Sequence, residues 1–272
     1  MTINAFDLLS GEDIPFAGIC TLRVPVLRSL RPKTGIGYDT YLQYLNMLAM
    51  DLHTLLTGMG IWEAYEALPA AEQAQYTAFR ILTAQQQMRG LLQEALSFFI
   101  CEAVSFDASR MCFLLSRENA RGAAAGPGQA GSSGSEARGF TDSVISDENY
   151  ETVRSGILQI NCLSFRQTAP KAFRNQKAKE IYEKTQKRKA ALAGQAKRGD
   201  DSMSLPNLIA SVAVQHNSYN LTNIWDLTVY QLYDQFARLN MKTQLDVTSL
   251  RWAAWGQEPF DFGLWYRDIY KA

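Results

Sequence analysis

Apolar side chains recur at intervals of three and four residues in several parts of this chain, and this spacing restricts the fold more than any other feature. The clearest stripe consists of Tyr41, Leu45, Leu48, Leu52 and Leu55. Residues at this spacing share one face of an α-helix, so we expect a single core helix that ends at Gly58-Met59-Gly60. Nearly half of the 272 residues are apolar, enough for a sizeable core. The chain is therefore expected to be folded and mainly helical.

Further helices are predicted from apolar faces and from capping signals. Residues 71–103 place Leu92, Leu96 and Phe99 on one face. A second face, following residue 228, consists of Val229, Leu232, Tyr233, Phe236 and Leu239. Thr228 and Gln231 have the spacing of a capping box, in which each side chain binds the backbone N–H of the other. This pair therefore predicts the first residue of that helix.

Two more helix starts and one polar helix are expected. Ser146, followed by Asp147 and Glu148, has a capping hydroxyl and first-turn acids, which predicts a helix to about Cys162. Ser204 before Leu-Pro predicts another helix, to about Gln215. Residues 169–198 read as a long polar helix with few apolar side chains.

Short extended segments complete the fold class. Residues 21–24 read as a strand that Pro25 stops, and residues 104–107 and 111–115 read as two more. Residues 143–146 are expected to return as a strand beside residues 111–115. The predicted class is mainly α with a small β-hairpin or short mixed sheet, an α+β fold with a helical core.

Residues 121–139 differ from the rest because they hold Gly, Ala and Ser but no large apolar residue. Such a segment cannot offset the entropy of being ordered. The predicted organisation is an N-terminal helical part (1–120), a flexible loop (121–139) and a C-terminal helical part (140–272). Two alternatives stay open: a swollen hairpin loop within one shared core, or a true domain boundary.

Charge is balanced overall but not along the chain. Lys plus Arg and Asp plus Glu number 27 each, so no global field favours nucleic acid or membrane. Residues 171–198, however, hold ten Lys or Arg against two Glu. The basic candidates for partner binding are Lys184, Lys187, Arg188 and Lys189. They could dock an acidic protein, contact phosphates, or simply be solvated.

No catalytic, cofactor-binding or metal-binding constellation is evident. The run Gly126–Gly131 matches a dinucleotide fingerprint by letter, but it lies in the flexible stretch without a strand before it. Asp261-Phe262-Gly263 spells a kinase triplet without the other kinase motifs. The two histidines and the four cysteines, which are spread along the chain, lack the spacing of metal ligands, so we expect buried reduced thiols and no enzyme activity.

The N-terminal residues do not resemble a signal peptide, and the apolar stretches are too short to span a membrane. We therefore expect a cytoplasmic protein that does not enter a membrane.

Aromatic residues crowd the start of the helix after residue 228. Trp225, Tyr230, Tyr233 and Phe236 lie within a dozen residues of one another. A helix has one buried face, and a surplus of rings beyond that face is typical of interface anchors. These four residues are the predicted partner-binding aromatics.

The run from Asn217 to Phe236 resembles the C-terminal signature of proteins encoded in tail-morphogenesis clusters of long-tailed bacteriophages and prophages. Three other segments of the chain are similar to these proteins as well. They are Asn175–Glu180, Val104-Ser-Phe-Asp107, and the N-terminal Val24-Pro25 with Tyr38 and Tyr41. The stretch 121–139 departs from this pattern. The resemblance implies a tail assembly chaperone or related tail component, acting without catalysis.

The partners that the resemblance implies are the tape-measure protein, which the chain would keep soluble, and the tail-tube subunits that assemble around it. It would work in the cytoplasm of the bacterial host or be part of the virion tail. Two alternatives remain: a structural component of the tail or baseplate, and a nucleic-acid-binding protein that uses residues 171–198.

Overall fold

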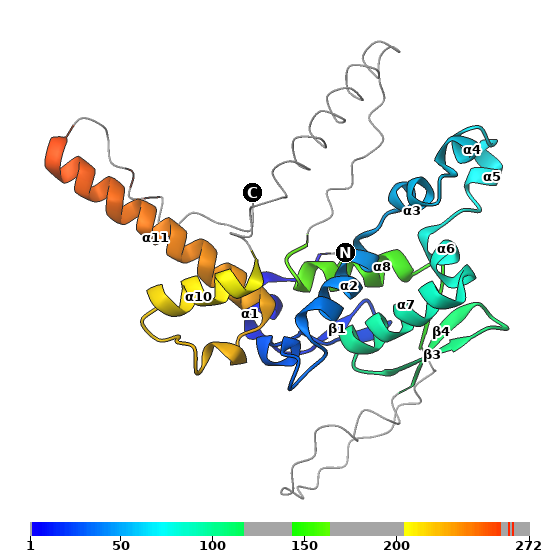
Figure 1. The fold of residues 1–272 in the computed structure, drawn as a ribbon, viewed down its shortest axis with the longest axis horizontal. Coiled ribbons are helices and arrows are strands. Elements are labelled where there is room, and N and C mark those ends of the chain that lie inside the picture. Colours follow the sequence, from blue (N-terminus) through cyan, green and yellow to red (C-terminus); the bar gives the residue numbers. More distant parts are fainter. Residues whose placement is uncertain (1, 117–142, 164–203, 257–260, 262, 264–272) are drawn as a thin grey trace, which may run out of the picture. The chain divides into compact units, whose positions relative to one another are not determined.

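A computed structural model describes residues 2–116, 143–163, 204–256, 261 and 263 of the chain (Figure 1). Over these residues the protein is mainly helical, with two small antiparallel sheets. The predicted α+β class with a helical core is therefore confirmed. The described helices include none that combines the length and the apolar character needed to cross a bilayer.

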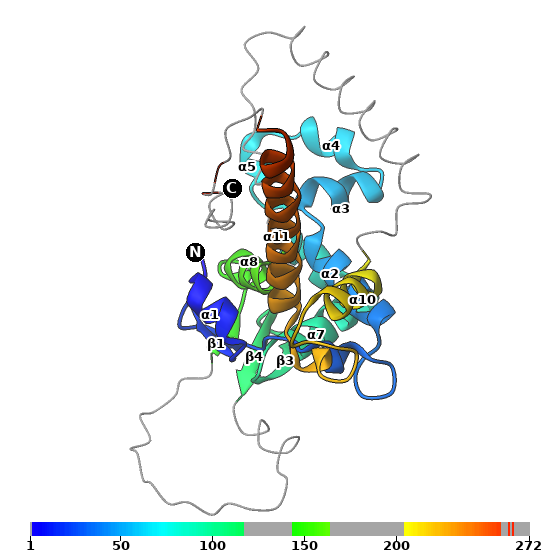
Figure 2. The ribbon, with the colours of Figure 1, turned by 90° about the vertical axis from the view of Figure 1, so that its left-hand side faces the viewer.

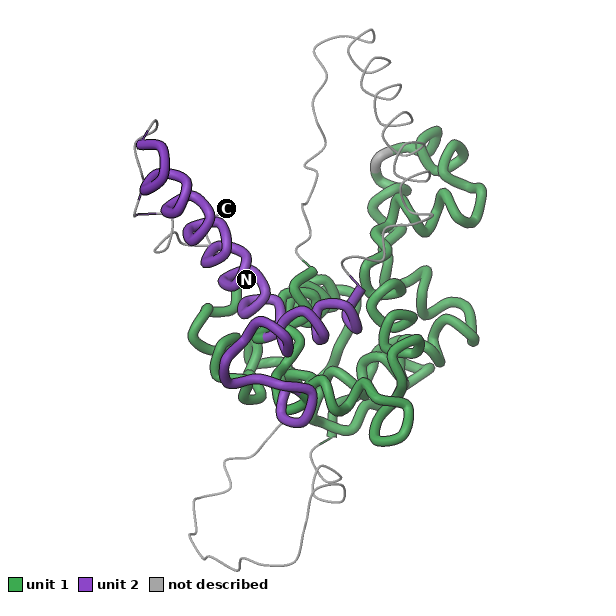
Figure 3. Tube along the Cα trace, turned by 60° about the vertical axis from the view of Figure 1, so that its left-hand side comes forward, with its two compact units in different colours: residues 1–164, 225–231 green, residues 165–224, 232–272 purple. Residues whose placement is uncertain are grey.

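The chain divides into two compact units, shown in different colours in Figure 3. Unit 1 comprises residues 1–164 and 225–231, and unit 2 comprises residues 165–224 and 232–272. Unit 1 is thus discontinuous in sequence, since a short segment from near the C-terminus belongs to it. The predicted loop at 121–139 lies outside the described residues.

The elements of unit 1 are mostly short. Its helices are α1 (Ala5–Ser10), η1 (Leu27–Leu30), α2 (Tyr38–Ala49), α3 (Leu52–Gly58), α4 (Trp62–Glu66), α5 (Ala70–Gln73), α6 (Ala78–Ala84), α7 (Gln86–Phe99) and α8 (Tyr150–Ile160). Its strands are β1 (Ile14–Phe16), β2 (Cys20–Leu22), β3 (Ala103–Asp107), β4 (Cys112–Ser116) and β5 (Ser143–Ile145). Unit 2 contains α10 (Leu205–Gln215) and most of α11 (Val229–Trp255), and the short η3 (Ile224–Asp226) spans both units.

The first sheet is the hairpin of β1 and β2, in which Phe16 lies opposite Cys20. The strand expected at residues 21–24 is therefore present slightly earlier, and β1 is its partner. The chain around β2 also binds the end of α7. The Arg23 N–H donates to the Phe99 carbonyl at 2.8 Å, and the Cys101 N–H donates to the Thr21 carbonyl at 2.9 Å.

The second sheet has the order β3-β4-β5, and both pairings are antiparallel. On β4, Phe113 lies opposite Phe106 of β3 and Ile145 of β5. The expectation that residues 143–146 return as a strand beside residues 111–115 is confirmed.

The core of unit 1 forms where α7 and α8 cover the strands. Leu92, Leu96 and Phe99 of α7 are completely buried, as their spacing predicts. On α8, a side chain at Gly156 would bring its Cβ within 2.8 Å of both Leu22 and Phe16. Glycine is therefore required there for α8 to pack closely on the first sheet.

The single helix predicted through residues 41–55 is wrong. The structure has two helices, because Asp51 caps α3 by accepting the Thr54 N–H at 2.8 Å. The end of α2 is held by the buried Arg154 of α8, whose guanidinium donates to the Met50 carbonyl at 2.9 Å and the Ala49 carbonyl at 3.3 Å. A cation that binds the last carbonyls is a common way to end a helix.

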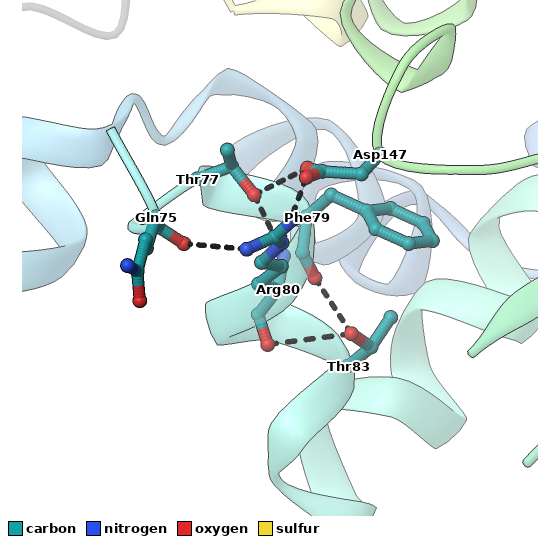
Figure 4. A network of polar contacts seen from close by, with 6 residues as sticks. All are labelled: Gln75, Thr77, Phe79, Arg80, Thr83 and Asp147. Carbon is teal, nitrogen blue, oxygen red and sulfur yellow. Dashed lines mark hydrogen bonds and ion pairs between the residues drawn. The ribbon is translucent and has the colours of Figure 1, made fainter. Parts of the chain in front are cut away.

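The single helix predicted at residues 71–103 is also interrupted, and gives α5, α6 and α7. Thr77 starts α6 by accepting the Arg80 N–H at 3.2 Å. The Thr77 hydroxyl also binds the Asp147 carboxylate, which forms an ion pair with Arg80 at 2.8 Å (Figure 4). This polar network fixes the start of α6 to the turn before α8.

The helix start predicted with Ser146 as its cap is three residues too early, because Asp147 has a distant partner. Helix α8 begins at Tyr150, and residues 147–149 form a turn. Asp147 was expected in the first turn of α8 but instead contacts α6. By contrast, α10 begins directly after Ser204 and ends at Gln215, as predicted.

The structure describes all four cysteines, and none of them forms a disulfide. Cys20 and Cys112 are buried, as expected. Cys101 is half-buried and Cys162 is exposed, so the expectation of burial is wrong for Cys162.

Helices α3, α4 and α5 lie together at one end of unit 1, away from the sheet of β3 and β4 (Figures 1 and 2). We call residues 51–76, which contain these three helices, the helical arm.

Candidate partner-binding site

The start of α11 is fixed by the capping box that the sequence predicts. The Gln231 N–H donates to the Thr228 hydroxyl at 3.1 Å, and the Thr228 N–H donates to the Gln231 side-chain oxygen at 2.9 Å. The Gln231 amide also donates to the Leu9 carbonyl at 2.8 Å. The same side chain therefore caps the helix and ties its first turn to the N-terminal helix of unit 1.

Backbone pairing holds the segment before α11 within unit 1. The Leu27 N–H donates to the Leu227 carbonyl at 2.8 Å, and Val26 forms an antiparallel bridge with Thr228. These contacts explain why residues 225–231 belong to unit 1.

Two arginines of unit 1 contact the same segment through their side chains. Arg28 forms an ion pair with Asp226 at 2.6 Å, and the Arg31 guanidinium lies over the Trp225 ring, 4.9 Å from its centroid. A guanidinium above an indole is a favourable cation–π arrangement. Trp225 thus already has a partner inside the chain.

The four predicted anchor rings differ in exposure. Tyr230 is buried, with 9% of its surface exposed, whereas Trp225, Tyr233 and Phe236 are partly exposed. The monomer therefore does not enclose all four rings. Their role in binding a partner stays a prediction.

The distal half of α11 carries a more exposed apolar set that sequence reasoning missed. The exposed fractions are 60% for Val247, 70% for Leu250, 48% for Trp252 and 69% for Trp255. We call these four residues the distal apolar set. Val247, Leu250 and Ala254 continue the spacing of Val229, Leu232 and Phe236, and this was the signal that could have found them.

Charged residues of α11 pair along the helix itself. Lys242 and Asp246 approach to 3.9 Å, and Arg238 lies 3.1 Å from Asp234, both at a spacing of four residues. Such pairs stabilise an exposed helix modestly.

The predicted basic residues Lys184, Lys187, Arg188 and Lys189 lie outside the described residues, as does the Gly126–Gly131 run. Asp261 accepts the Gly263 N–H at 2.8 Å, as in a turn.

A shallow hollow lies beside α7 in unit 1. Its volume is about 530 Å³, and Arg23, Tyr44, Glu94 and Phe98 are among its lining residues. The Arg23 guanidinium donates to the Ser97 and Phe98 carbonyls, each at 3.3 Å, and the Tyr44 hydroxyl donates to Glu94 at 3.3 Å. Burial and the nearby Glu94 raise the pKa of Tyr44. These groups are engaged in holding α2 and α7.

Two described carboxyl groups have clearly shifted pKa values, and both shifts are downward. Burial tends to raise the pKa of Asp51, but hydrogen bonds from Thr54 outweigh it and lower the value. Hydrogen bonds from Ser109 lower the pKa of the exposed Asp107. Both groups are therefore ionised at neutral pH, as caps and turn residues should be.

The histidines have local roles. His53 packs edge-on against Trp62 at 4.4 Å, and the His216 Nδ1 accepts the backbone N–H groups of Ser218 and Tyr219. Within the part of the chain that the structure describes, no group of three or more potential ligands is placed to hold a metal ion.

Residues 173–270, which include α10 and α11, match the family model of the YomV second domain. YomV is a phage- or prophage-associated protein, and the match spans 98 of the 272 residues. No curated protein and no solved structure matches the chain.

Proposed function

We propose that this chain is a non-enzymatic tail-assembly protein of a bacteriophage or prophage, which binds the tape-measure or tail-tube proteins through α11. The YomV match supports a phage context. The resemblance of residues 217–236 to tail-morphogenesis proteins supports the tail as the place of action. The observation that carries the binding role is the exposed distal apolar set on α11.

The energetics favour a helical partner. Burying one leucine or valine side chain stabilises an association by about 1.5–3 kcal/mol, and tryptophan is enriched among the residues that dominate interfaces. Val247 and Leu250, one turn apart, are suited to enter the groove of another helix or to pack along it. A tape-measure protein, being long and helical, offers repeated surfaces of that kind.

The direct test is a pull-down and a titration of the full chain against the tape-measure protein encoded in the same gene cluster. We expect binding at micromolar concentration, weakened at least tenfold by the double substitution Val247→Asp and Leu250→Asp. The matched control is Gln244→Asp, an exposed position of the same helix outside the set. Absence of binding by the wild type, or equal binding by the double variant, would refute the proposal.

A structural component of the tail or baseplate is the second candidate, because the same exposed set suits a permanent contact. The two roles differ in the fate of the chain after assembly. Purified mature particles should lack a chaperone and contain a structural component, so mass spectrometry of the particles separates them.

A further inference from the structure

The helical arm contains few buried side chains, although it is rich in apolar and aromatic residues. Among its described side chains, only Leu55 and Leu56 are buried, and α4 has no buried residue. Met59, Ile61 and Tyr76 are 46%, 38% and 41% exposed. The arm therefore presents more apolar surface than its own packing requires.

Ring contacts stiffen the arm from within. His53, Trp62, Tyr65 and Tyr76 form a chain of contacts, with successive ring centroids 4.4, 5.3 and 5.7 Å apart. The amide of Gln73 adds a hydrogen bond of 3.0 Å to the Leu68 carbonyl between α4 and α5. The exposed surface thus belongs to an ordered element.

A methionine-rich cleft lies at the base of the arm, where α3 faces α6 and α7. Its volume is about 240 Å³, and its walls include Met50, Leu55, Gly58, Met59, Ile81 and Met88. This volume is below the usual range for cofactor and drug-sized sites but accepts one large apolar side chain. Methionine side chains adapt their shape easily and are used on surfaces that receive varied apolar anchors.

The charge of the arm has a single sign. It holds Asp51, Glu63, Glu66 and Glu72 but no Lys or Arg, which gives a formal charge of −4. Glu63, Glu66 and Glu72 are exposed, and the described residues provide no ion-pair partner for them. The cleft therefore lies beside a helical element with three exposed carboxylates that have no ion-pair partner among the described residues.

From these observations we propose that the arm and its cleft are a second docking surface, and that its occupant is a lysine- or arginine-rich amphipathic helix of a partner protein. One large apolar side chain of that helix enters the methionine cleft, and its basic residues face the carboxylates of α4 and α5. This is helix-in-groove recognition with charge complementarity. The surface goes beyond the proposed function, because it lies in unit 1 and uses no residue of α11.

The first test uses a labelled synthetic helix of about four turns, built from leucine and lysine at helical spacing. Its fluorescence anisotropy is measured with the full chain at two salt concentrations. We expect binding that weakens with salt, and about tenfold weaker binding by the triple variant Glu63→Gln, Glu66→Gln, Glu72→Gln. A peptide with glutamate in place of every lysine should not bind.

The matched control neutralises three exposed acids outside the arm, through Asp7→Asn, Glu12→Gln and Glu148→Gln. This variant keeps the same net charge as the arm variant, so it separates a local site from a general effect of charge. Equal weakening by the two triple variants overturns the proposal, as does wild-type binding of the glutamate peptide.

The second test fills the cleft. Gly58 lines the cleft, a Cβ added there meets no heavy atom within 4 Å, and its φ is not positive, so a side chain can begin at this position without backbone strain. Gly58→Leu should occlude the cleft and weaken peptide binding about tenfold, whereas Gly58→Ala should bind as the wild type does. Undiminished binding by Gly58→Leu removes the cleft from the proposal and overturns it.

Sedimentation of the full chain without peptide identifies a different occupant. If the wild type self-associates and the triple arm variant does not, a second copy covers the arm, and the proposal of a foreign basic helix is wrong. None of these measurements involves the tape-measure protein or the distal apolar set. Failure here therefore leaves the proposed function standing, and failure of the tape-measure pull-down leaves this surface untouched.

Discussion

The apolar stripe of α7 and the pair Val247 and Leu250 of α11 both have helical spacing but lie in opposite environments. Leu92, Leu96 and Phe99 are completely buried within unit 1. Val247 and Leu250, at equivalent positions along their own helix, are 60% and 70% exposed. Spacing therefore predicts that a helix has an apolar face, but the rest of the fold decides whether that face is covered.

This comparison separates stability from association. A covered stripe contributes to the free energy of unfolding, because its removal leaves a cavity. An exposed stripe contributes little to folding and can contribute to binding. Matched substitutions in the two regions should show this difference directly.

The largest expected difference is between Leu96→Ala and Leu250→Ala. Leu96→Ala should lower the free energy of unfolding by about 3 kcal/mol, because it empties a fully buried site. Leu250→Ala should change it by less than about 0.5 kcal/mol. Urea denaturation followed by far-ultraviolet circular dichroism measures both. Similar losses for the two variants would mean that α11 is covered in solution.

A second pair compares a buried cation with an exposed one. Arg154→Ala should cost about 3 kcal/mol, because it leaves the last carbonyls of α2 short of donors and Glu151 without its 2.6 Å ion pair. Lys242→Ala removes an exposed pair and should cost less than about 0.5 kcal/mol. Thermal unfolding of both variants tests this. A small loss for Arg154→Ala would show that water replaces the guanidinium at the end of α2.

A third pair compares the anchored start of α11 with its middle. Thr228→Ala should cost about 1 kcal/mol through loss of the capping box, and Thr228→Ser should restore most of it. Thr243→Ala, which removes an exposed hydroxyl bonded to the Leu239 carbonyl at 2.9 Å, should have almost no effect. Hydrogen exchange of the first turn of α11 measures the difference. Unchanged exchange in Thr228→Ala would contradict a role for the box in holding this end.

The prediction for the thiols has no effect at neutral pH and concerns alkaline solution only. Burial, with the nearby charges of Glu102 and Cys101, raises the pKa of Cys20 to about 12, against an ordinary value of 9.0. Burial and the carboxylate of Asp13 raise the pKa of Cys101 to about 11. Below pH 9 both states keep their protons, so stability does not depend on these groups. Above pH 9 the unfolded chain loses protons that the folded chain keeps, and stability should fall as pH rises.

The same contrast should be visible in reactivity. At pH 8 iodoacetamide should modify the exposed Cys162 before the buried Cys20. Peptide mapping by mass spectrometry gives the order. Early modification of Cys20 would indicate local opening of the first sheet.

Much of the local structure could be predicted because it depends on neighbours in sequence. The capping box of Thr228 and Gln231, the start of α10 and the return of β5 beside β4 all follow from short-range patterns. The stripe of α7 was correct because its residues belong to one uninterrupted helix.

The errors arise where a polar side chain has a distant partner. The helix predicted through residue 51 is broken because Asp51 caps α3 and Arg154, more than a hundred positions later, ends α2. Ser146 was expected to cap α8 with Asp147 in its first turn, but Asp147 lies before the helix and binds Thr77 and Arg80. Spacing within a single segment contains no information about such partners.

The candidate site was predicted in part. The aromatic start of α11 was recognised by composition, yet its attachment to residues 26–31 requires the fold. The distal apolar set was missed because the prediction stopped at Leu239, before the stripe resumes at Val247. The basic residues 184 and 187–189 lie outside the described residues, so their role stays a prediction.

The pairing of β4 with β5 has a practical consequence for protein engineering. Leu115 lies opposite Ser143, so the chain leaves the sheet after Ser116 at the place where it re-enters. The register of β4 and β5 is therefore compatible with a connection as short as a tight turn. A turn of about four residues in place of residues 117–142 should therefore keep the pairing of β4 with β5. The same junction would accept an affinity tag or a fluorescent reporter without altering the register of either strand.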